Sequence, residues 1–434
     1  MFFEKRWKEV TLMTREIKVI TPEYIEDYLT VYLNAYPAYK NVGDEGRDKM
    51  RPRVLYSMEN DKTIHFFGLF QDGKLIASMK LIDFSMNAFG TMKKATGLMS
   101  LAVHPMYKKQ GAAKAMVKYF EEYTMKSGAI VAMLLPFRID FYRKMGYGYG
   151  SRMETFEIPT VSLPKAELKP NSEIKFIGSE DKDTDALLEC YERFALKNHG
   201  MVSKFPDEAR DYYGDSETRR AGYYENGSLE GYVTYDMVSV HPDNYTLNRI
   251  NVKEVVYNSK DAFKALIGFL RNQSDLGSTI TIRTGEPDFY HILPSAQSVS
   301  GNYSNFGFLE TNTASVGTMY KIPDPAFFIK ETSDRKFIPC SIKVKFLYEN
   351  EFEHRTDELN VEFTGDGHWK NTDAGNADVT VFLTLSTLSS LFMGSAGFAG
   401  LYRLGAVEID KKDMVDTLDR IFYVSQKPWT NTDY

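Results

Sequence analysis

Two segments of the chain contain the same order of predicted elements, and this repeat constrains the fold more than any other feature of the sequence. In each segment a helix is followed by a hairpin, a strand, a short loop and a second helix. The hairpins centre on residues 72–73 (Asp-Gly) and 226–227 (Asn-Gly), which favour a type I′ turn because both of its central positions need positive φ. Helices and strands in this order predict an α/β or α+β fold present in two copies.

The spacing of the repeat shows where the two copies differ. The offset between them is 258 − 105 = 153 residues at the end of the strand and 265 − 115 = 150 residues in the helix that follows. Three residues are therefore missing from the second loop, where PMYKKQG has become NSKD, without a glycine. The second copy has kept the order of elements and lost the loop.

The first helix of each copy is predicted from its start signal and its apolar spacing. In the first copy Thr21 would cap the helix with its hydroxyl, and Pro22 would occupy the first helical position. In the second copy the corresponding helix is expected over residues 183–197. The helices after the two loops are expected from about residue 112 to 126 and around residue 265.

The third segment, from about residue 325, has a different pattern. Three runs alternate apolar and polar side chains, which predicts half-buried antiparallel strands at residues 342–348, 359–363 and 379–383. Two short helices are expected after them, over residues 388–392 and 414–421. The sequence therefore predicts three domains, at residues 1–150, 151–324 and 325–434.

Composition and charge exclude several classes of protein. With 53 Lys and Arg against 59 Asp and Glu the net charge is −6, so the chain lacks the basic surface of a nucleic-acid-binding protein, and a cationic partner is easier to bind. Two cysteines in 434 residues, Cys190 and Cys340, indicate a reducing compartment, and we expect the cytoplasm. The N-terminal MFFEKRWKEV is not a signal peptide, Met13 is an alternative start, and non-classical secretion stays open.

One stretch, residues 379–402, contains no charged residue up to Tyr402 and could be mistaken for a membrane span. It contains seven Ser or Thr residues and three glycines, whereas a span needs about 20 predominantly apolar residues. A buried strand that leads into a helix explains the stretch better. We therefore expect no membrane span.

The loop of the first copy carries the clearest chemical signal. Residues 107–114, YKKQGAAK, lie between a strand and a helix, where unpaired backbone N–H groups and the helix dipole can receive a phosphate. Gly111 and the two alanines after it let a ligand approach, and Lys108 and Lys109 add positive charge. On these eight residues alone, a solvated basic turn capped by glycine is the favoured interpretation, because short glycine motifs often match by chance.

The surrounding sequence resembles a known family. LAVHPMYKKQGAA at residues 101–113 resembles the acetyl-CoA motif of the GNAT acetyltransferases, with Lys108 where Arg or Gln is usual. FYRKMGYG at residues 141–148 is similar to the tyrosine-containing segment of the Eis family. That resemblance covers the whole chain and implies an active GNAT domain, a second GNAT fold without its cofactor loop, and a sterol carrier protein-like domain.

The resemblance also implies which residues form the site. Acetyl-CoA would be the co-substrate, with no metal. Its pantetheine would pair with the strand backbone at Leu101 and Val103, and the loop would hold the pyrophosphate. The full implied cofactor set is Leu101, Ala102, Val103, Lys108, Lys109, Gln110, Gly111, Ala112, Ala113, Lys114, Phe137 and Arg138.

Two catalytic groups are implied by the same resemblance. Tyr142 would protonate the leaving thiolate, because a tyrosine with a pKa of about 10 stays protonated at neutral pH. The C-terminal carboxylate of Tyr434 would act as the base, and Asp433 beside it would attract a cation. Without the resemblance, Tyr142 would be a core aromatic and the C-terminus a frayed tail, although Trp429 argues against fraying.

The expected activity is transfer of acetyl to a primary amine, on aminoglycoside-like, polyamine or lysine substrates, by direct transfer in a ternary complex. One departure puts the substrate range in doubt: Phe137 and Arg138 stand where aminoglycoside-modifying Eis members carry a small Ser-Glu pair. The resemblance also implies a homohexamer. The alternative is a lipid-binding or scaffolding protein that works through its third domain.

Histidine suggests no competing chemistry. The seven histidines show no metal-ligand spacing, so no metal site is expected. His104 lies beside the predicted cofactor strand. We expect it to position the loop rather than to act as a base.

Overall fold

The computed structural model describes residues 14–36, 38, 41–178, 180–302, 307–373, 375–432 and 434. The chain divides into two compact units. The first contains Met1–Asp83, Thr96–Ser127 and Tyr434, and the second contains Phe84–Ala95 and Gly128–Asp433. This division into two compact units does not test the three predicted domain boundaries, which stay a prediction.

The first unit is built around a twisted sheet with the strand order β1-β2-β3-β4. Two of these strands, β3 and β4, continue into the hairpin that belongs to the second unit. The elements are β1 (Arg15–Val19), η1 (Pro22–Tyr24), α1 (Ile25–Ala35), α2 (Asp44–Asn60), β2 (Ile64–Gln71), β3 (Lys74–Ala88), β4 (Thr91–Val103), η2 (Pro105–Tyr107) and α3 (Ala112–Lys126).

The local signals of the first copy are confirmed, with one exception. Asp72 and Gly73 both have positive φ, 50° and 80°, and connect β2 to β3 as a type I′ turn requires. The helix α3 has the predicted bounds. The first helix begins with the 3₁₀ turn η1, and the Thr21 hydroxyl makes no capping hydrogen bond, because the chain at Thr21 is followed by the tighter 3₁₀ turn. The capping part of that prediction is therefore wrong.

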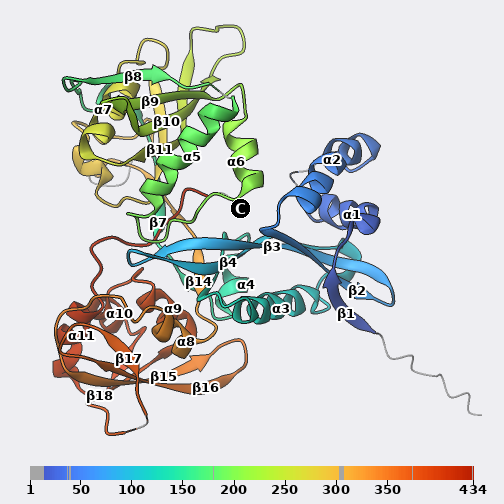
Figure 1. Ribbon diagram of the computed structural model, residues 1–434, viewed down its shortest axis with the longest axis vertical. Coiled ribbons are helices and arrows are strands. Elements are labelled where there is room, and N and C mark those ends of the chain that lie inside the picture. The colour runs from blue at the N-terminus through green and yellow to red at the C-terminus, as the bar shows by residue number, and fades with distance from the viewer. Residues whose placement is uncertain are drawn as a thin grey trace, which may run out of the picture. The chain divides into compact units, whose positions relative to one another are not determined.

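The second copy forms a separate seven-stranded sheet, with the order β13-β7-β12-β11-β10-β9-β8. In Figure 1, α5 and α6 lie on one face of this sheet and α7 on the other. The elements are β7 (Arg152–Pro159), η3 (Thr160–Ser162), β8 (Ser172–Phe176), α5 (Asp181–Ala195), α6 (Pro206–Tyr213), β9 (Arg219–Glu225), β10 (Ser228–Ser239), β11 (Asn248–Tyr257), α7 (Lys260–Arg271), β12 (Thr279–Thr284), η4 (Phe289–Ile292) and β13 (Thr313–Val316).

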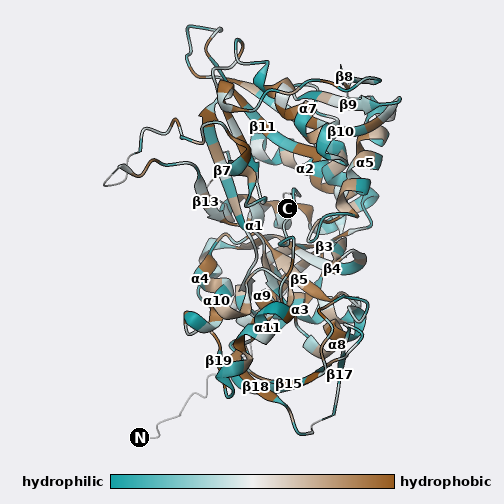
Figure 2. Cartoon of the chain, turned by 90° about the vertical axis from the view of Figure 1, so that its left-hand side faces the viewer, coloured by the Kyte–Doolittle hydropathy of each residue, from teal (hydrophilic) through white to brown (hydrophobic). Residues whose placement is uncertain are grey.

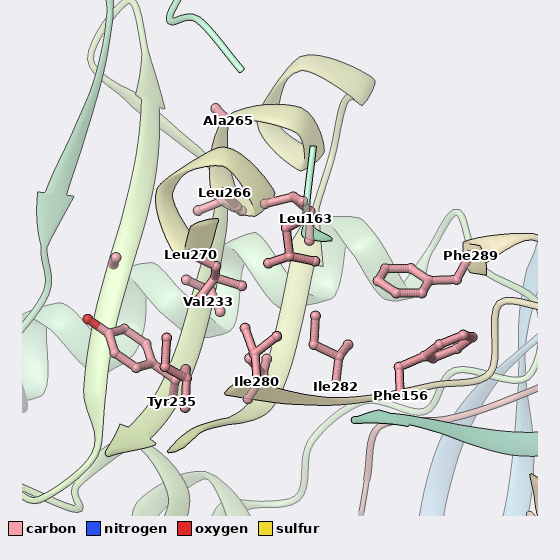
Figure 3. Close-up of a cluster of buried hydrophobic side chains, with 14 of the residues drawn as sticks. Phe156, Leu163, Val233, Tyr235, Ala265, Leu266, Leu270, Ile280, Ile282 and Phe289 are labelled. Atoms are coloured by element: carbon pink, nitrogen blue, oxygen red, sulfur yellow. The ribbon is translucent and has the colours of Figure 1, made fainter. Parts of the chain in front are cut away.

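The core of the second copy lies between α7 and the sheet. Leu266 and Leu270 of α7 face Ile280 and Ile282 of β12 (Figure 3), and all four are buried. Burial of each such aliphatic side chain contributes about 1.5–3 kcal/mol. The strand β11 contains both hydrophobic and hydrophilic residues (Figure 2), and its Ile250 and Val252 belong to this core. The predicted hairpin and helices of the second copy are confirmed.

Within the second unit, a group of three strands pairs in the order β5-β14-β6. Its elements are β5 (Val131–Leu134), α4 (Ile139–Arg143), β6 (Gly148–Tyr149) and β14 (Met319–Lys321). The third domain contains α8 (Pro325–Glu331), β15 (Ile342–Asn350), β16 (Arg355–Phe363), β17 (Trp369–Asn371), β18 (Val379–Thr384), α9 (Leu385–Phe392), α10 (Phe398–Arg403), β19 (Glu408–Ile409), η6 (Lys412–Met414) and α11 (Val415–Ile421).

The strand prediction for the third domain is partly wrong. The pair β15–β16 is antiparallel, as predicted, but β15 and β18 are parallel. Apolar and polar side chains alternate in parallel and in antiparallel strands alike, so this alternation does not predict the direction of a strand. The direction follows from the connection, because the chain passes through β17 and returns to the other side of β15.

The charge-free stretch forms β18, α9 and α10, as predicted, and every residue of α9 is buried. Within the described residues, no helix is long and apolar enough to cross a membrane. The helices lie on one side of the sheet (Figure 1), and aromatic rings fill the space between them. These rings are Phe328, Phe346, Phe363, Trp369, Phe392 and Phe422, each at most 1% exposed and with ring centroids 5.2–6.2 Å apart.

One buried histidine joins several parts of the second unit. His199 Nε2 lies 2.9 Å from the carbonyl oxygen of Met393, and the N–H of Phe89 donates to His199 Nδ1 at 3.2 Å. The Phe89 donor assigns the proton of the neutral ring to Nε2, and the carbonyl oxygen of Asn87 also lies 3.2 Å from Nδ1. The ring also stacks on Phe89, with centroids 4.1 Å apart. The β3–β4 hairpin, the second copy and the third domain therefore meet at one imidazole.

Burial lowers the pKa of His199 to about 4, although the carbonyl oxygens of Met393 and Asn87 favour the protonated form, and nearby Arg335 lowers the pKa further. The folded pKa lies below the unfolded value of about 6.5. The stabilisation is therefore complete above about pH 6.5 and is lost as the pH falls toward 4, because the unfolded chain then binds the extra proton.

We predict that the melting temperature of the protein falls between pH 7 and pH 5, with a loss of about 1.4 kcal/mol per pH unit attributable to His199. The variant His199→Gln keeps a donor and an acceptor without an ionisable ring. It should melt at a lower temperature at pH 7 and show a shallower dependence on pH. Equal pH slopes for the two proteins, measured by thermal denaturation, would contradict this assignment.

Candidate active site

The predicted loop of the first copy lies between the end of β4 and the start of α3. Residues of α3 anchor it, because Ala112, Met116 and Val117 are buried against the first unit. Lys108, Lys109, Gln110 and Gly111 are exposed. The loop is therefore held at the helix and open to solvent at the positions where a ligand would bind.

The first turn of α3 presents backbone donors rather than side chains. Gly111 precedes the helix with φ 84°, in the left-handed region, and makes no side-chain cap. The first hydrogen bond into the helix runs from the Ala115 N–H to the Gly111 carbonyl oxygen, at 3.0 Å. The N–H groups of Ala112 and Ala113 therefore have no partner inside the helix. A Cβ at Gly111 would meet nothing within 4 Å, so glycine is required there by its φ and not by lack of space.

The equivalent helix of the second copy is closed by its own side chain. Ser259 precedes α7, and its Oγ accepts a hydrogen bond from the Ala262 N–H at 3.1 Å. A serine cap of this kind satisfies one of the donors that α3 leaves open. Loss of the loop in the second copy is therefore accompanied by loss of its anion-binding character.

The loop of the first copy has a left-handed residue before Gly111 and a brace from the first strand. Lys109 has φ 61°, and successive residues of this kind turn backbone N–H groups toward one side, where an anion can bind. Arg15 Nη1 donates to the Gln110 carbonyl oxygen at 2.9 Å, and its Nε donates to Gln71 Oε1 at 2.8 Å. Sequence analysis missed Arg15, because nothing in the local pattern connects it with a loop 95 residues away.

The strand β4 departs from regular geometry just before the predicted pantetheine positions. Ser100 has φ 57°, which a strand residue does not normally adopt. The Tyr36 hydroxyl donates to the Leu101 carbonyl oxygen at 3.0 Å, which occupies one of the two lone pairs of that oxygen. Neither Ser100 nor Tyr36 was identified from the sequence.

His104 has the role expected from the sequence. Its Nδ1 accepts a hydrogen bond from the Met106 N–H at 3.3 Å and so caps the turn η2. Its backbone N–H donates to the Ile76 carbonyl oxygen at 2.9 Å. His104 therefore positions the chain between strand and loop.

Tyr142 lies on α4 in the second unit and is 7% exposed. Its ring contacts those of Phe141 and Tyr147, at centroid distances of 5.1 and 5.7 Å. Burial raises the pKa of Tyr142 to about 12. Its hydroxyl makes no hydrogen bond to any residue that the structure describes, so the phenolic proton is not committed to a structural partner.

Phe137 and Arg138 precede α4 with exposed side chains. Phe137 is 76% exposed. Arg138 forms a two-point ion pair with Asp140, whose shorter contact is 2.6 Å. An exposed pair of this kind contributes little to stability and can exchange for a ligand. The assignment of these two residues to the cofactor site stays a prediction.

The C-terminal segment is buried and not frayed. Pro428, Trp429, Thr430 and Thr432 are all buried within the second unit. The last residue, Tyr434, groups with the first unit, which also contains the loop. Asp433 lies outside the described residues. The roles of Tyr142 and Tyr434 in catalysis remain predictions.

Comparison with known proteins agrees with this geometry. Residues 16–150 and residues 200–319 each match a model of an acetyltransferase (GNAT) domain, and residues 335–431 match a sterol carrier protein domain. The chain is a tandem GNAT acetyltransferase. The Eis-type order of domains and the fold class predicted from the sequence are confirmed. No curated protein sequence matches the chain at a significant level.

Solved structures share the fold of this acetyltransferase over its whole length. A probable N-acyltransferase from Enterococcus faecalis has a TM-score of 0.76 at 19% identity, and covers 98% of this chain and 100% of its own. A GCN5-related N-acetyltransferase from Anabaena variabilis has a TM-score of 0.76 at 15% identity, with 97% and 100% covered. Eis1 from Mycobacterium abscessus has a TM-score of 0.74 at 18% identity, with 97% and 100% covered.

The tandem GNAT acetyltransferase therefore carries the fold of acyl-CoA-dependent N-acetyl transfer, and the first copy fits such a co-substrate. The open donors of α3, the space around Gly111 and the exposed lysines suit a pyrophosphate. In the described part of the chain, no group of three or more potential metal ligands is found.

We predict that Gly111→Ala weakens acetyl-CoA binding by about tenfold or more, because the substituted residue cannot adopt φ 84° without strain and the donors of α3 would turn away. Isothermal titration with CoA measures the effect. The matched control is Gly405→Ala, which also replaces a glycine of positive φ with open space around it. Equal CoA affinity in Gly111→Ala and wild-type protein would remove this loop from the cofactor site.

Proposed function

We propose that the protein transfers acetyl from acetyl-CoA to a primary amine, in one ternary complex, at a site built on the first copy. The observation that carries the proposal is the start of α3, where Gly111 leaves backbone donors open while Ser259 closes the equivalent helix. Acetyl-CoA supplies an activated acetyl thioester, and the chain supplies the groups around it.

The proposed acceptor is a small molecule or a peptide that carries an amine, such as an aminoglycoside, a polyamine or a lysine side chain. The net charge of −6 favours approach of a cation. Attack requires a neutral amine, so the amine must lose a proton before or during the reaction. The exposed Phe137 and the paired Arg138 are the positions where we expect the range of acceptors to be set.

Tyr142 is the proposed general acid. With a pKa raised to about 12 by burial, its Oη holds a proton throughout the neutral range and can donate it to a departing thiolate. A thiol with a pKa of about 8.5 is the stronger acid, so the donation is favourable only if the phenolate regains a proton. The surplus proton of the amine can serve for this.

We predict that Tyr142→Phe lowers kcat by about 100-fold and changes acetyl-CoA affinity less than twofold, because it removes a proton donor and little binding area. Free-thiol release from acetyl-CoA, measured against aminoglycosides, polyamines and lysine peptides, provides kcat. Tyr149→Phe is the matched control, since Tyr149 is 43% exposed and lies on the neighbouring strand β6. Unchanged kcat in Tyr142→Phe would exclude the phenol as the acid.

The dependence of kcat on pH tests the role of Tyr142 as the acid in a second way. Because its pKa is raised, Tyr142 should remain protonated beyond the ordinary value of about 10. The wild-type kcat should therefore rise as the amine deprotonates and stay level up to about pH 10, after subtraction of spontaneous hydrolysis. A loss of activity centred at or below pH 10 that is absent in Tyr142→Phe would contradict the raised pKa.

The Tyr434 carboxylate is the proposed base. An α-carboxylate has a pKa of about 3.5 and is a weak base, so it would act through a water molecule or by orienting an amine that is already partly neutral. Its grouping with the first unit supports the proposal, because the loop belongs to that unit. Thr432, two residues earlier, is buried.

We predict that removal of Tyr434 lowers kcat by about 100-fold and leaves acetyl-CoA affinity within twofold of wild type. The truncation shortens the chain and moves its carboxylate, while the loop and α3 stay intact. Steady-state kinetics and CoA titration together separate the two effects. A control with one added residue after Tyr434 should show a comparable loss of kcat. If both variants turn over like wild type, the terminal carboxylate has no part in the reaction.

We also propose a homohexamer and a reducing, cytoplasmic location. The hexamer rests on the Eis resemblance alone. The location is supported by the two cysteines, which are both free, with Cys190 buried. The alternative of a lipid carrier is disfavoured by the third domain, whose interior is occupied by packed aromatic rings.

A further inference from the structure

The second copy has kept one feature of the cofactor site that its loop has lost. Its strands β11 and β12 pair in parallel over four residue pairs that end at Val252 and Ile282. Immediately afterwards, β11 has a bulge at Lys253, because Thr234 pairs with Glu254 and Tyr235 pairs with Val252. Beyond the bulge the two strands no longer pair with each other.

This bulge occupies the same place in the repeat as the irregular residue of β4. Lys253 lies 253 − 100 = 153 residues after Ser100, the offset found between the ends of the two strands. A bulge bends a strand and ends its regular pairing, so it opens a gap beside the neighbouring strand. The second copy therefore retains the divergence of two strands that would admit a ligand.

The C-terminal segment fills this gap. A cavity of about 180 Å³ remains there, lined by Val255 and Tyr257 of β11, by Ile282 of β12, and by Trp429 and Asn431. Trp429 also packs with the buried cluster on the α5 side of the sheet, whereas Val255 packs with the cluster on the α7 side. The indole therefore lies where β11 and β12 separate.

Close approach and hydrogen bonding hold Trp429 there. It is 8% exposed. A Cβ added to Gly285, the residue after β12, would lie 2.5 Å from Trp429 Cγ, so the indole occupies the volume that a side chain at Gly285 would need. The backbone N–H of Trp429 donates to the His199 carbonyl oxygen at 3.2 Å, and Gln426 Oε1 accepts from the His199 backbone N–H at 3.0 Å.

We infer that the C-terminal segment of the chain occupies the place of the cofactor cleft in the second GNAT fold. Trp429 is the positioning residue that holds this segment there. The inference rests on the proposed role of Tyr434, which follows Trp429 by five residues. A buried indole fixes the chain direction shortly before the terminal carboxylate. The degenerate copy thus has a function in the reaction, as the holder of a segment and not as a binder of CoA.

The test compares Trp429→Ala and Gly285→Ala with Phe289→Ala in the full-length protein. The first two remove or displace the indole, whereas Phe289→Ala removes a buried ring that lines the same cavity on the α7 side. Native digestion with a carboxypeptidase measures release of the terminal tyrosine, independently of activity. We expect release to be about tenfold faster or more in the first two variants, and near wild type in Phe289→Ala.

Kinetics complete the experiment. We expect kcat to fall at least about tenfold in Trp429→Ala and Gly285→Ala, with CoA affinity within twofold of wild type, and Trp429→Phe to restore much of the loss. Unchanged tyrosine release in both variants would overturn the anchoring role of Trp429, whatever happens to kcat. Faster release with unchanged kcat would leave the anchor in place and instead overturn the carboxylate as base.

Discussion

The second unit depends on a neutral imidazole that is surrounded by backbone groups from several parts of the chain. His199 connects the hairpin at Phe89 with the third domain at Met393, and its own carbonyl oxygen receives the backbone N–H of Trp429. Burial holds the pKa of this ring low, because a charged imidazole would lose its hydration here. Segments far apart in the sequence are therefore joined by a residue whose charge state must not change.

The two copies show how one fold can support different functions through the residue that precedes a helix. Gly111 gives α3 an open end, and Ser259 closes the end of α7 with a single hydroxyl. Both helices lie beside a strand that is irregular at the equivalent position, Ser100 in one copy and Lys253 in the other. The second copy has thus kept the irregular strand geometry and lost the loop. The gap beside that strand must be filled, because an empty apolar space in a core destabilises the fold.

Local features could be predicted from the sequence, and long-range ones could not. The turn at Asp72 and Gly73, the helix after Gly111 and the strand that leads into a buried helix within residues 379–402 follow from short-range rules of φ and hydropathy, and the structure has them. The brace of the loop by Arg15 and the parallel pairing of β18 depend on connections through space, which no local pattern contains. The same is true of the strand irregularities at Ser100 and Lys253, since neither residue type marks such a position in a sequence.

The interior of the third domain is packed with aromatic side chains. Arg335 is buried without a carboxylate partner among the described residues, and its Cζ lies 3.7 Å from the centroid of the Phe89 ring. A guanidinium stacked on aromatic rings is held by their quadrupoles, and burial lowers its pKa to about 9. Arg335 thereby fixes the ring that covers His199, and His199 in turn binds the segment that leads to Tyr434. The third domain thereby helps to position the C-terminal segment of the chain.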